Sequence, residues 1–305
     1  MSNRFPRRTF LKSLAVSSLA LSQSRPSPRG RIHGACFSPW TMGEDPNLGA
    51  TITPQELGRR MSWIAADTRW IRTYGVAGGL EHAGAIAHNL GLSSSLGAWL
   101  GRDPAANQAQ LAALVARANA GDVDLAFVGN ETLLRGDLDE AGLVQLLQDA
   151  RARLPAGLPL TTAETWSTWL AHPCLVAAVD SVAAHVHPYW DGIGIDAALV
   201  YMEQRVDALH TLAGAKPVLV AETGWPTCGP ARGACVPSLA NSLRYFREVA
   251  SWSRESGVPC FWFEALDEPF KANYEGPAGA CWGYRDASGQ LKLGFEAFFQ
   301  GIRTR

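Results

Sequence analysis

Phe127-Val128-Gly129-Asn130-Glu131 and Val218-Leu219-Val220-Ala221-Glu222 are two short, mostly apolar stretches, and each ends on a glutamate. A run of this kind, bounded by turn residues, is typical of an interior strand of a parallel sheet. A carboxylate at the mouth of such a strand loses water without an obvious partner, which is unfavourable for stability. Two strands that end in this way therefore indicate a pair of functional carboxylates.

Six more strand-like runs accompany these two, and amphipathic segments separate them. Thr53-Pro54 and Asp103-Pro104 each place an N-capping residue before a first-turn proline, which is a helix-start signal. Asp137 or Asp139 opens another helix, and Pro237-Ser238 precedes a further one. The expected strands cover 32–37, 70–74, 92–99, 125–131, 160–164, 181–187, 218–222 and 260–264, and the last helix covers about 293–302.

Eight strands that alternate with helical segments are the count of a (β/α)8 barrel, the TIM barrel, in a single α/β domain. A doubly wound open sheet alternates in the same way, but it should carry a glycine-rich phosphate loop after its first strand. Here the first strand runs into Cys36-Phe37-Ser38-Pro39-Trp40, which contains no such loop. The sequence therefore predicts a (β/α)8 barrel over residues 31–305.

The first thirty residues differ from the rest, because they carry six basic side chains and no acidic one. Pro6-Arg7-Arg8-Thr9-Phe10-Leu11-Lys12 resembles a bacterial twin-arginine export signal. The apolar stretch that follows it is too short to span a bilayer. We expect residues 1–30 to be an export signal with a short linker and the protein to be periplasmic or extracellular. An ordinary basic tail is the alternative.

Charge argues against nucleic acid as a partner. The whole chain has 27 basic and 28 acidic side chains. Without the 6 basic residues of the leader, 21 basic and 28 acidic side chains remain, a net charge of −7. An acidic domain is repelled by nucleic acid and by anionic membranes. No later segment is apolar enough for a transmembrane helix, and we expect a monomer.

Six cysteines fit an oxidising compartment. Cys228 and Cys235 bracket a turn-rich loop that can close a local disulfide, although the sequence does not decide whether it does. Cys36 and Cys260 lie in apolar strands, where a cysteine is often a small core residue. No Cys-x-x-Cys pair occurs, so we expect no structural zinc site.

The ends of the expected strands carry carboxylates, amides and aromatic rings. Aromatic faces stack against sugar rings, while carboxylates and amides bind hydroxyl groups, so this composition favours a carbohydrate site. Glu131 ends the fourth strand and Glu222 the seventh, and a pair of carboxylates can break a glycosidic bond. Structural ion pairs are the alternative for both glutamates. The residues at the strand ends are Ser38, Trp40, Tyr74, Trp99, Asn130, Glu131, Glu164, His187, Tyr189, Glu222, Trp225, Glu264 and Glu268.

Other residues allow more than one interpretation. His185 and His187 face the same side of a strand, but no third ligand at a suitable spacing completes a metal site. We expect His187 to position the sugar or a carboxylate, and His185 to be a satisfied core residue. Trp166 and Trp169 form either a sugar platform or packing between helix and barrel. Arg72 binds a carboxylate at the barrel mouth or makes a buried structural pair.

The chain resembles glycoside hydrolase family 17, the β-1,3-glucanases and β-1,3-glucanosyltransferases, over residues of about 32–300. The two motifs that carry the resemblance are Val128-Gly129-Asn130-Glu131 and Glu222-Thr223-Gly224-Trp225-Pro226. Further segments that match in order are Ile71-Arg72-Thr73-Tyr74, Leu96-Gly97-Ala98-Trp99-Leu100, Thr162-Ala163-Glu164, Val186-His187-Pro188-Tyr189 and Phe263-Glu264-Ala265-Leu266-Asp267-Glu268-Pro269-Phe270-Lys271.

The resemblance implies a retaining glycosidase, with Glu131 as acid/base and Glu222 as nucleophile, and it implies no cofactor and no metal. Asn130 is placed to bind the substrate 2-hydroxyl, a contact that strengthens in the transition state. The expected substrate-binding and supporting residues are Tyr74, Asn130, His187, Tyr189, Trp225, Glu264, Glu268, Lys271 and Trp282.

The sequence therefore predicts an exported bacterial hydrolase of β-1,3-glucan that acts by double displacement. A glucanosyltransferase with the same glycosyl-enzyme intermediate is the first alternative. A non-catalytic glucan-binding protein on the same scaffold is the second, and a retaining glycosidase for another β-glucan or a β-mannan is the third.

Overall fold

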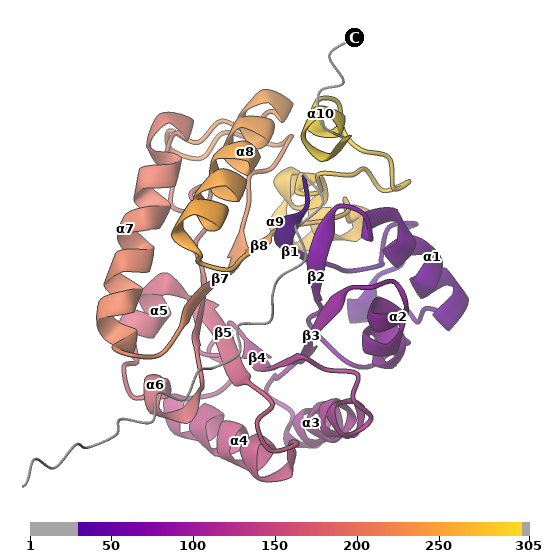
Figure 1. Cartoon of the computed structure of the whole chain (residues 1–305), viewed down its shortest axis with the longest axis vertical. Helices are drawn as coiled ribbons and strands as arrows, with labels where there is room; N and C mark the ends of the chain where they lie inside the picture. Colours follow the sequence, from indigo (N-terminus) through magenta and orange to yellow (C-terminus); the bar gives the residue numbers. More distant parts are fainter. Residues whose placement is uncertain (1–29, 301–305) are drawn as a thin grey trace, which may run out of the picture.

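A computed structural model describes residues 30–300 and contains a closed barrel of eight parallel strands in the order β1 to β8. Figure 1 looks along the barrel, with the strands around the centre and the helices outside them. The predicted (β/α)8 single domain is confirmed. The strands are β1 Ile32–Cys36, β2 Thr68–Arg72, β3 Ser93–Ala98, β4 Leu125–Asn130, β5 Leu160–Thr165, β6 Val182–His185, β7 Val218–Thr223 and β8 Cys260–Trp262.

The helices begin where the capping signals predicted them. The side chains of Thr53, Asp103 and Ser238 each accept a backbone N–H from the first turn that follows them. Asp139 rather than Asp137 caps the helix after β4. The helices are α1 Pro54–Ile64, α2 Ala83–Asn89, α3 Pro104–Asn119, α4 Glu140–Arg153, α5 Trp166–Ala171, α6 Leu175–Ala178, α7 Ile195–Ala213, α8 Leu239–Ser256, α9 Ala272–Glu275 and α10 Phe295–Gln300, with short 3-10 turns η1 Pro46–Leu48, η2 Leu80–His82, η3 Pro269–Lys271 and η4 Pro277–Cys281.

Several strands end earlier than the sequence predicted. β2 stops at Arg72 and β6 at His185, so Tyr74 and His187 lie just beyond the hydrogen-bonded barrel. His187 is still buried beyond β6, whereas Tyr74 is half-buried beyond β2. Both follow the carboxyl ends of their strands, where functional residues of such barrels gather.

Trp169 packs between helix and barrel rather than forming a sugar platform. Its side chain is fully buried in α5, and its indole N–H donates to the carbonyl of Ala183 in β6 at 2.8 Å. Trp166, at the start of the same helix, is half-buried and packs edge-on against Tyr201. The guanidinium of Arg205 lies 4.8 Å above the Trp166 ring, so that ring is occupied by protein contacts as well.

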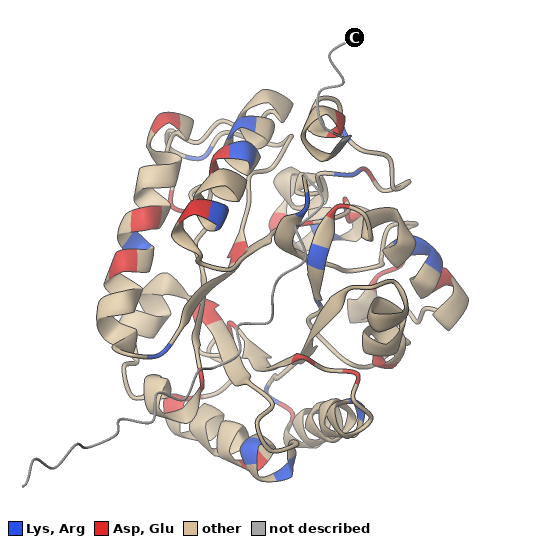
Figure 2. Cartoon of the chain, viewed as in Figure 1, with Lys and Arg blue, Asp and Glu red and all other residues tan. Residues whose placement is uncertain are grey.

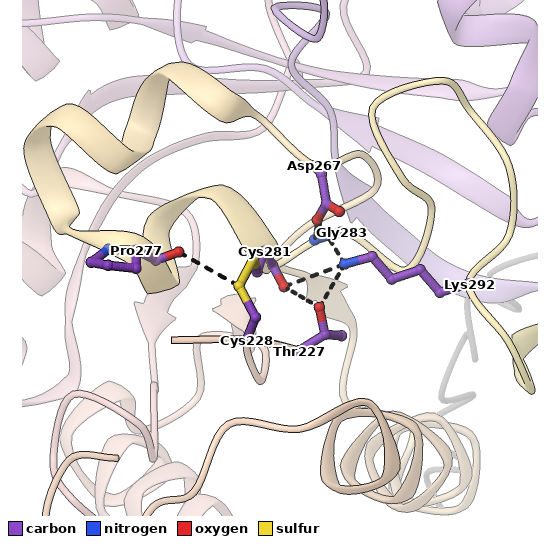
Figure 3. Close-up of a disulfide and its surroundings, with 7 residues drawn as sticks. All are labelled: Thr227, Cys228, Asp267, Pro277, Cys281, Gly283 and Lys292. Carbon is purple, nitrogen blue, oxygen red and sulfur yellow. Dashed lines mark hydrogen bonds and ion pairs between the residues drawn. A yellow bond between two sulfur atoms is a disulfide. The ribbon is translucent and has the colours of Figure 1, made fainter. Parts of the chain in front are cut away.

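The local disulfide that the sequence left open, between Cys228 and Cys235, does not form. Cys228 pairs with Cys281, 53 residues further along the chain, and Cys235 is a buried free thiol. The loop after β7 meets η4 at this point, which puts the two Cα atoms 5.6 Å apart (Figure 3). Spacing along the sequence could not reveal this contact, because it depends on how β8 and the loop after it return over the barrel. Cys36 and Cys260 are buried and free, as expected.

Lys292 stabilises the same contact between the loop after β7 and η4. Its ammonium group donates to Thr227 and to Asp267, each at 2.8 Å (Figure 3). Burial raises the pKa of Asp267 to about 6 even though Lys292 opposes the shift. The disulfide and this ion pair together fasten the loop after β7 to the segment that leads into Trp282.

Charged residues of both signs cover the outer helices, and α7 and α8 carry them side by side in Figure 2. Within residues 30–300 no helix is long and apolar enough to cross a membrane. The export signal expected over residues 1–30 lies outside the described residues, apart from Gly30.

Candidate active site

The chain turns sharply where β4 ends, at Gly129 and at Glu131, the first residue after the strand. Gly129 has φ +92°, and a Cβ there would lie 2.7 Å from the Thr132 hydroxyl, so the position requires glycine. Glu131 follows with φ +51°, and within residues 30–300 it is the single non-glycine residue in the left-handed region. Its backbone N–H donates to Ala163 of β5 at 2.7 Å, which holds the turn in place. Its side chain is 26% exposed, so this carboxyl remains accessible at the barrel mouth.

Glu164 at the end of β5 supports the turn from below. Its buried carboxyl accepts the backbone N–H groups of Leu133, at 2.8 Å, and Leu134, at 3.4 Å. Burial raises the pKa of Glu164 to about 7, and the nearby charge of Glu131 adds to the rise while the two amides oppose it. Glu164 therefore fixes the residues after Glu131, a role that the sequence did not assign to it.

Glu222 of β7 occupies the opposite electrostatic situation, because donors surround its buried carboxylate. Arg72 lies 2.6 Å from Oε1, His185 lies 3.1 Å from the same oxygen, and His187 lies 3.2 Å from Oε2. Burial alone raises the pKa of this carboxyl. The interactions with His185, Arg72 and His187 together outweigh burial and hold the pKa of Glu222 well below its usual range. Glu222 is therefore ionised in the folded protein.

Arg72 joins this carboxylate to the residue next to Glu131. The guanidinium is 1% exposed and donates through Nη1 to Glu222 and through Nη2 to Asn130 Oδ1 at 2.5 Å. Since a guanidinium only donates, the oxygen of the Asn130 amide faces Arg72 and the amide nitrogen faces away from it. Both alternatives for Arg72 are met by one contact, because the carboxylate that it binds at the barrel mouth is buried together with it.

His185 lies between the two glutamates. Its Nδ1 is 2.7 Å from Glu131 Oε1, and its Nε2 is 3.1 Å from Glu222 Oε1. One imidazole ring therefore contacts both carboxylates. The expected buried and satisfied histidine is confirmed, but its partners at the site were not foreseen, because the period of the strand places a residue on a face without saying what that face meets.

A second carboxyl pair lies beneath the loop after β8. Lys271 bridges the carboxylates of Glu264 and Glu268, and the Ser38 hydroxyl donates to Glu268. Burial raises the pKa of Glu264 well above its usual range, Lys271 opposes the rise, and Glu268 adds to it. All three predicted residues, Glu264, Glu268 and Lys271, therefore form one network, and Lys271 also lies 4.4 Å above the ring of Phe263.

Aromatic rings line the side of the site next to this network. Trp282 is fully buried, with its ring centroid 5.4 Å from that of His187 and 5.6 Å from that of Tyr189. The Tyr189 hydroxyl donates to the carbonyl of Pro230 at 3.2 Å. The predicted residues His187, Tyr189 and Trp282 thus form one cluster, and His187 connects that cluster to Glu222.

Two predicted substrate-binding residues have other surroundings. Trp225 is fully buried, its indole N–H donates to the Val236 carbonyl at 3.1 Å, and its ring packs against Tyr245. These contacts explain the Trp225 side chain as packing. Tyr74 lies beside the site, with the Arg72 guanidinium 5.0 Å above its ring. A substrate contact for either residue stays a prediction. Within residues 30–300 no cluster of three or more histidine, cysteine or acidic side chains is arranged to hold a metal ion.

A parallel barrel with paired carboxylates at the ends of β4 and β7 is the arrangement of a glycoside hydrolase. The model of the BtgE/BtgC glycoside hydrolase domain matches residues 34–283, and the chain belongs to this family.

Curated relatives with similar sequences are fungal. The putative glucan endo-1,3-β-glucosidase btgC of Aspergillus niger is 27% identical over 293 residues, which cover 86% of this chain and 42% of that protein. The glucan 1,3-β-glucosidase of Saccharomyces cerevisiae is 25% identical, with 85% and 91% covered. The chain thus spans less than half of the btgC protein. The fungal relatives do not support the bacterial origin that the leader suggested.

Solved structures agree with the fold. An active-site mutant of the Rhizomucor miehei β-1,3-glucanosyltransferase in complex with laminaritriose has a TM-score of 0.76 and 25% identity, with 86% of this chain and 96% of that chain covered. An endo-laminarinase from Formosa Hel1_33_131 has the same TM-score at 19% identity, with 87% and 86% covered. The second likeness is one of fold alone.

Proposed function

We propose that this chain cleaves β-1,3-glucan with retention of configuration, with Glu222 as nucleophile and Glu131 as acid/base. The observation that carries the proposal is the environment of the two carboxyls. Glu222 is buried, ionised and bound by Arg72 and His187, which suits a nucleophile, whereas Glu131 is partly exposed at the mouth, where a leaving group can reach it. The names of the fungal relatives supply the substrate class.

In the first step Glu222 attacks the anomeric carbon while the bond from that carbon to the glycosidic oxygen breaks. Glu131 gives its proton to that oxygen, and a glycosyl ester of Glu222 remains. In the second step an incoming hydroxyl attacks the anomeric carbon, loses its proton to Glu131 and releases Glu222. Asn130 supports both steps, because its amide nitrogen faces away from Arg72 and is free to donate to the 2-hydroxyl of the sugar.

Two reactions share this chemistry. Attack by water gives hydrolysis, and attack by another sugar hydroxyl gives transglycosylation, for which the likeness to the Rhizomucor miehei β-1,3-glucanosyltransferase is the supporting observation. We favour hydrolysis by a monomer that is exported through the twin-arginine-type leader.

A product time course by mass spectrometry on laminari-oligosaccharides, with protein that lacks residues 1–30, tests the proposal. Products that are all shorter than the substrate indicate a hydrolase, and products that are longer indicate a transferase. Absence of any product, together with saturable binding of the oligosaccharide, would refute the enzyme and support a glucan-binding protein. Retention is tested separately by proton NMR, because the first product must have the β anomeric configuration.

A further inference from the structure

The ring of His185 lies between the two candidate catalytic glutamates. It ends β6, its side chain is fully buried, and each of its nitrogens has a separate partner. Nδ1 lies 2.7 Å from Glu131 Oε1, and Nε2 lies 3.4 Å from Arg72 Nη2. Arg72 binds Glu222 through its other terminal nitrogen at 2.6 Å. Glu222, Arg72, His185 and Glu131 therefore form one continuous chain of polar contacts.

The contact with Arg72 favours one tautomer of a neutral His185 ring. A guanidinium can only donate, so Nε2 accepts from Arg72. A neutral imidazole carries its single proton on the other nitrogen, so Nδ1 donates to Glu131 Oε1. If the ring gained a second proton, Nε2 would instead face Glu222 Oε1, which lies 3.1 Å away. In both protonation states Nδ1 is a donor to Glu131.

We propose that His185 is a positioning residue for Glu131, a role that rests on the proposed function. Donation from Nδ1 occupies Oε1, which leaves Oε2 to give a proton to the glycosidic oxygen and to take one from the incoming hydroxyl. When Glu222 becomes an ester it loses its negative charge, and Arg72 then donates more strongly to His185. Because hydrogen bonds in a chain polarise one another, Nδ1–H donates more strongly to Glu131 at the moment when Glu131 has become ionised.

The charged and titratable groups around the ring come from four strands. Glu131 follows β4, Glu222 lies on β7 and Arg72 ends β2. His187 follows β6, two residues after His185, and the centroids of the two imidazole rings are 6.3 Å apart. Glu164 on the adjacent β5 directs its carboxyl to the amides of Leu133 and Leu134 instead. A histidine retained only for packing would not need a donor and an acceptor matched to two separate partners.

The test compares two substrates that differ in their need for an acid. A laminari-oligosaccharide has a poor leaving group, whereas a 2,4-dinitrophenyl β-glycoside of the same sugar releases a phenolate that needs no proton. We expect His185→Phe to lower kcat/KM about 10²- to 10³-fold on the oligosaccharide, the usual contribution of a general acid. On the dinitrophenyl substrate, kcat/KM reports the first step alone, and for His185→Phe it should fall much less. Azide is a nucleophile that needs no base, so adding it should raise the kcat of His185→Phe on this substrate.

Two further variants make the result specific. His185→Gln keeps an amide donor and should recover part of the loss on the oligosaccharide. His33→Phe is the matched control, since His33 is a barrel histidine as well, but it packs between the rings of Trp70 and Phe261 in β1, near the other end of the barrel. It should leave kcat/KM on both substrates within about twofold of wild type, because surface and packing changes away from a site alter stability rather than chemistry.

Three outcomes would overturn the role of His185. Equal losses on both substrates would mean that His185 acts on Glu222 or on folding, and no loss on either would mean that it only packs. Should His185→Phe fail to fold, the ratio of the two kcat/KM values for His185→Gln decides in the same way. Wild-type protein that cleaves neither substrate would refute the proposed function itself, and the role of His185 with it.

Discussion

Arg72 is the residue whose loss should affect the barrel most, and Arg72→Met tests this. The guanidinium is 1% exposed and its main partner, Glu222, is 7% exposed, so the substitution leaves a buried carboxylate without its cation. Breaking a buried ion pair by removing one partner costs about 3–5 kcal/mol. For a chain of this size about 2 °C of Tm corresponds to 1 kcal/mol, so we expect Tm to fall by roughly 6–10 °C at pH 7.

The effect should depend on pH with a definite sign. The pKa of Glu222 is depressed in the folded state, so the stability it contributes is present above its unfolded pKa, near 4.5, and is lost as pH falls towards the folded value. Arg72→Met removes much of this contribution. The difference in unfolding free energy between wild type and variant should therefore be largest above pH 5 and should shrink on acidification.

Urea unfolding and calorimetry at pH 7 and pH 4 measure these differences. The matched control is Arg59→Met, which breaks an exposed Arg–Glu pair in α1 and should leave Tm almost unchanged. Arg72→Met combined with Glu222→Gln should recover part of the lost stability, because no unpaired charge remains buried. If Arg72→Met unfolds within about 2 °C of wild type, or if the double variant is less stable than Arg72→Met alone, the ion pair does not stabilise the barrel as argued here.

Three further predictions follow from features of the site and its rim. Gly129→Ala should lower the unfolding free energy by about 2–3 kcal/mol and reduce glucan cleavage. Gly136 is the control, because it also has a positive φ but has open space around it. Gly136→Ala should lower the unfolding free energy, measured in urea, by only about 1 kcal/mol. Replacing Cys228 and Cys281 by serine should lower the unfolding free energy by about 4 kcal/mol, the value for closing a loop of this length, while treatment of wild type with a reductant should give the same loss. Glu164→Gln should flatten the pH dependence of stability. Because the pKa of Glu164 is raised to about 7, the unfolding free energy of wild type should fall by up to about 3 kcal/mol as pH rises from about 4.5 to 7. If urea unfolding of the variant at pH 5 and pH 8 shows the same difference as wild type, this account of Glu164 is wrong.

The strands and most helix starts could be predicted because their causes are local. Thr53, Asp103 and Ser238 cap the first turn of the helix that follows each of them. Each apolar strand is a continuous run of residues in the sequence. The two glutamates stood out for the same reason, since each interrupts such a run at its end. The signal that marks them is the cost of placing a charge there.

The residues that the sequence analysis missed act across the barrel. His185 contacts β4 and β7 from β6, and Glu164 in β5 serves the loop after β4. Nothing in a single sequence records which side chains meet once eight strands close into a ring. The disulfide partner of Cys228 was missed on the same ground, because Cys281 reaches it only after β8 and the turns beyond it are in place. The one available signal for His185 was its spacing of two from His187, which placed both rings on one face.

The disulfide between Cys228 and Cys281 also decides what happens when the backbone is cut. The 53-residue span that it closes contains α8, β8 and the loop that carries Glu264 and Lys271. A protease that cleaves once within this span produces two fragments that remain covalently joined, so all eight strands stay in one molecule. A cut before Cys228 releases a separate piece instead. Limited digestion, with the fragments separated under denaturing conditions with and without reductant, therefore distinguishes nicks inside this span from nicks before it.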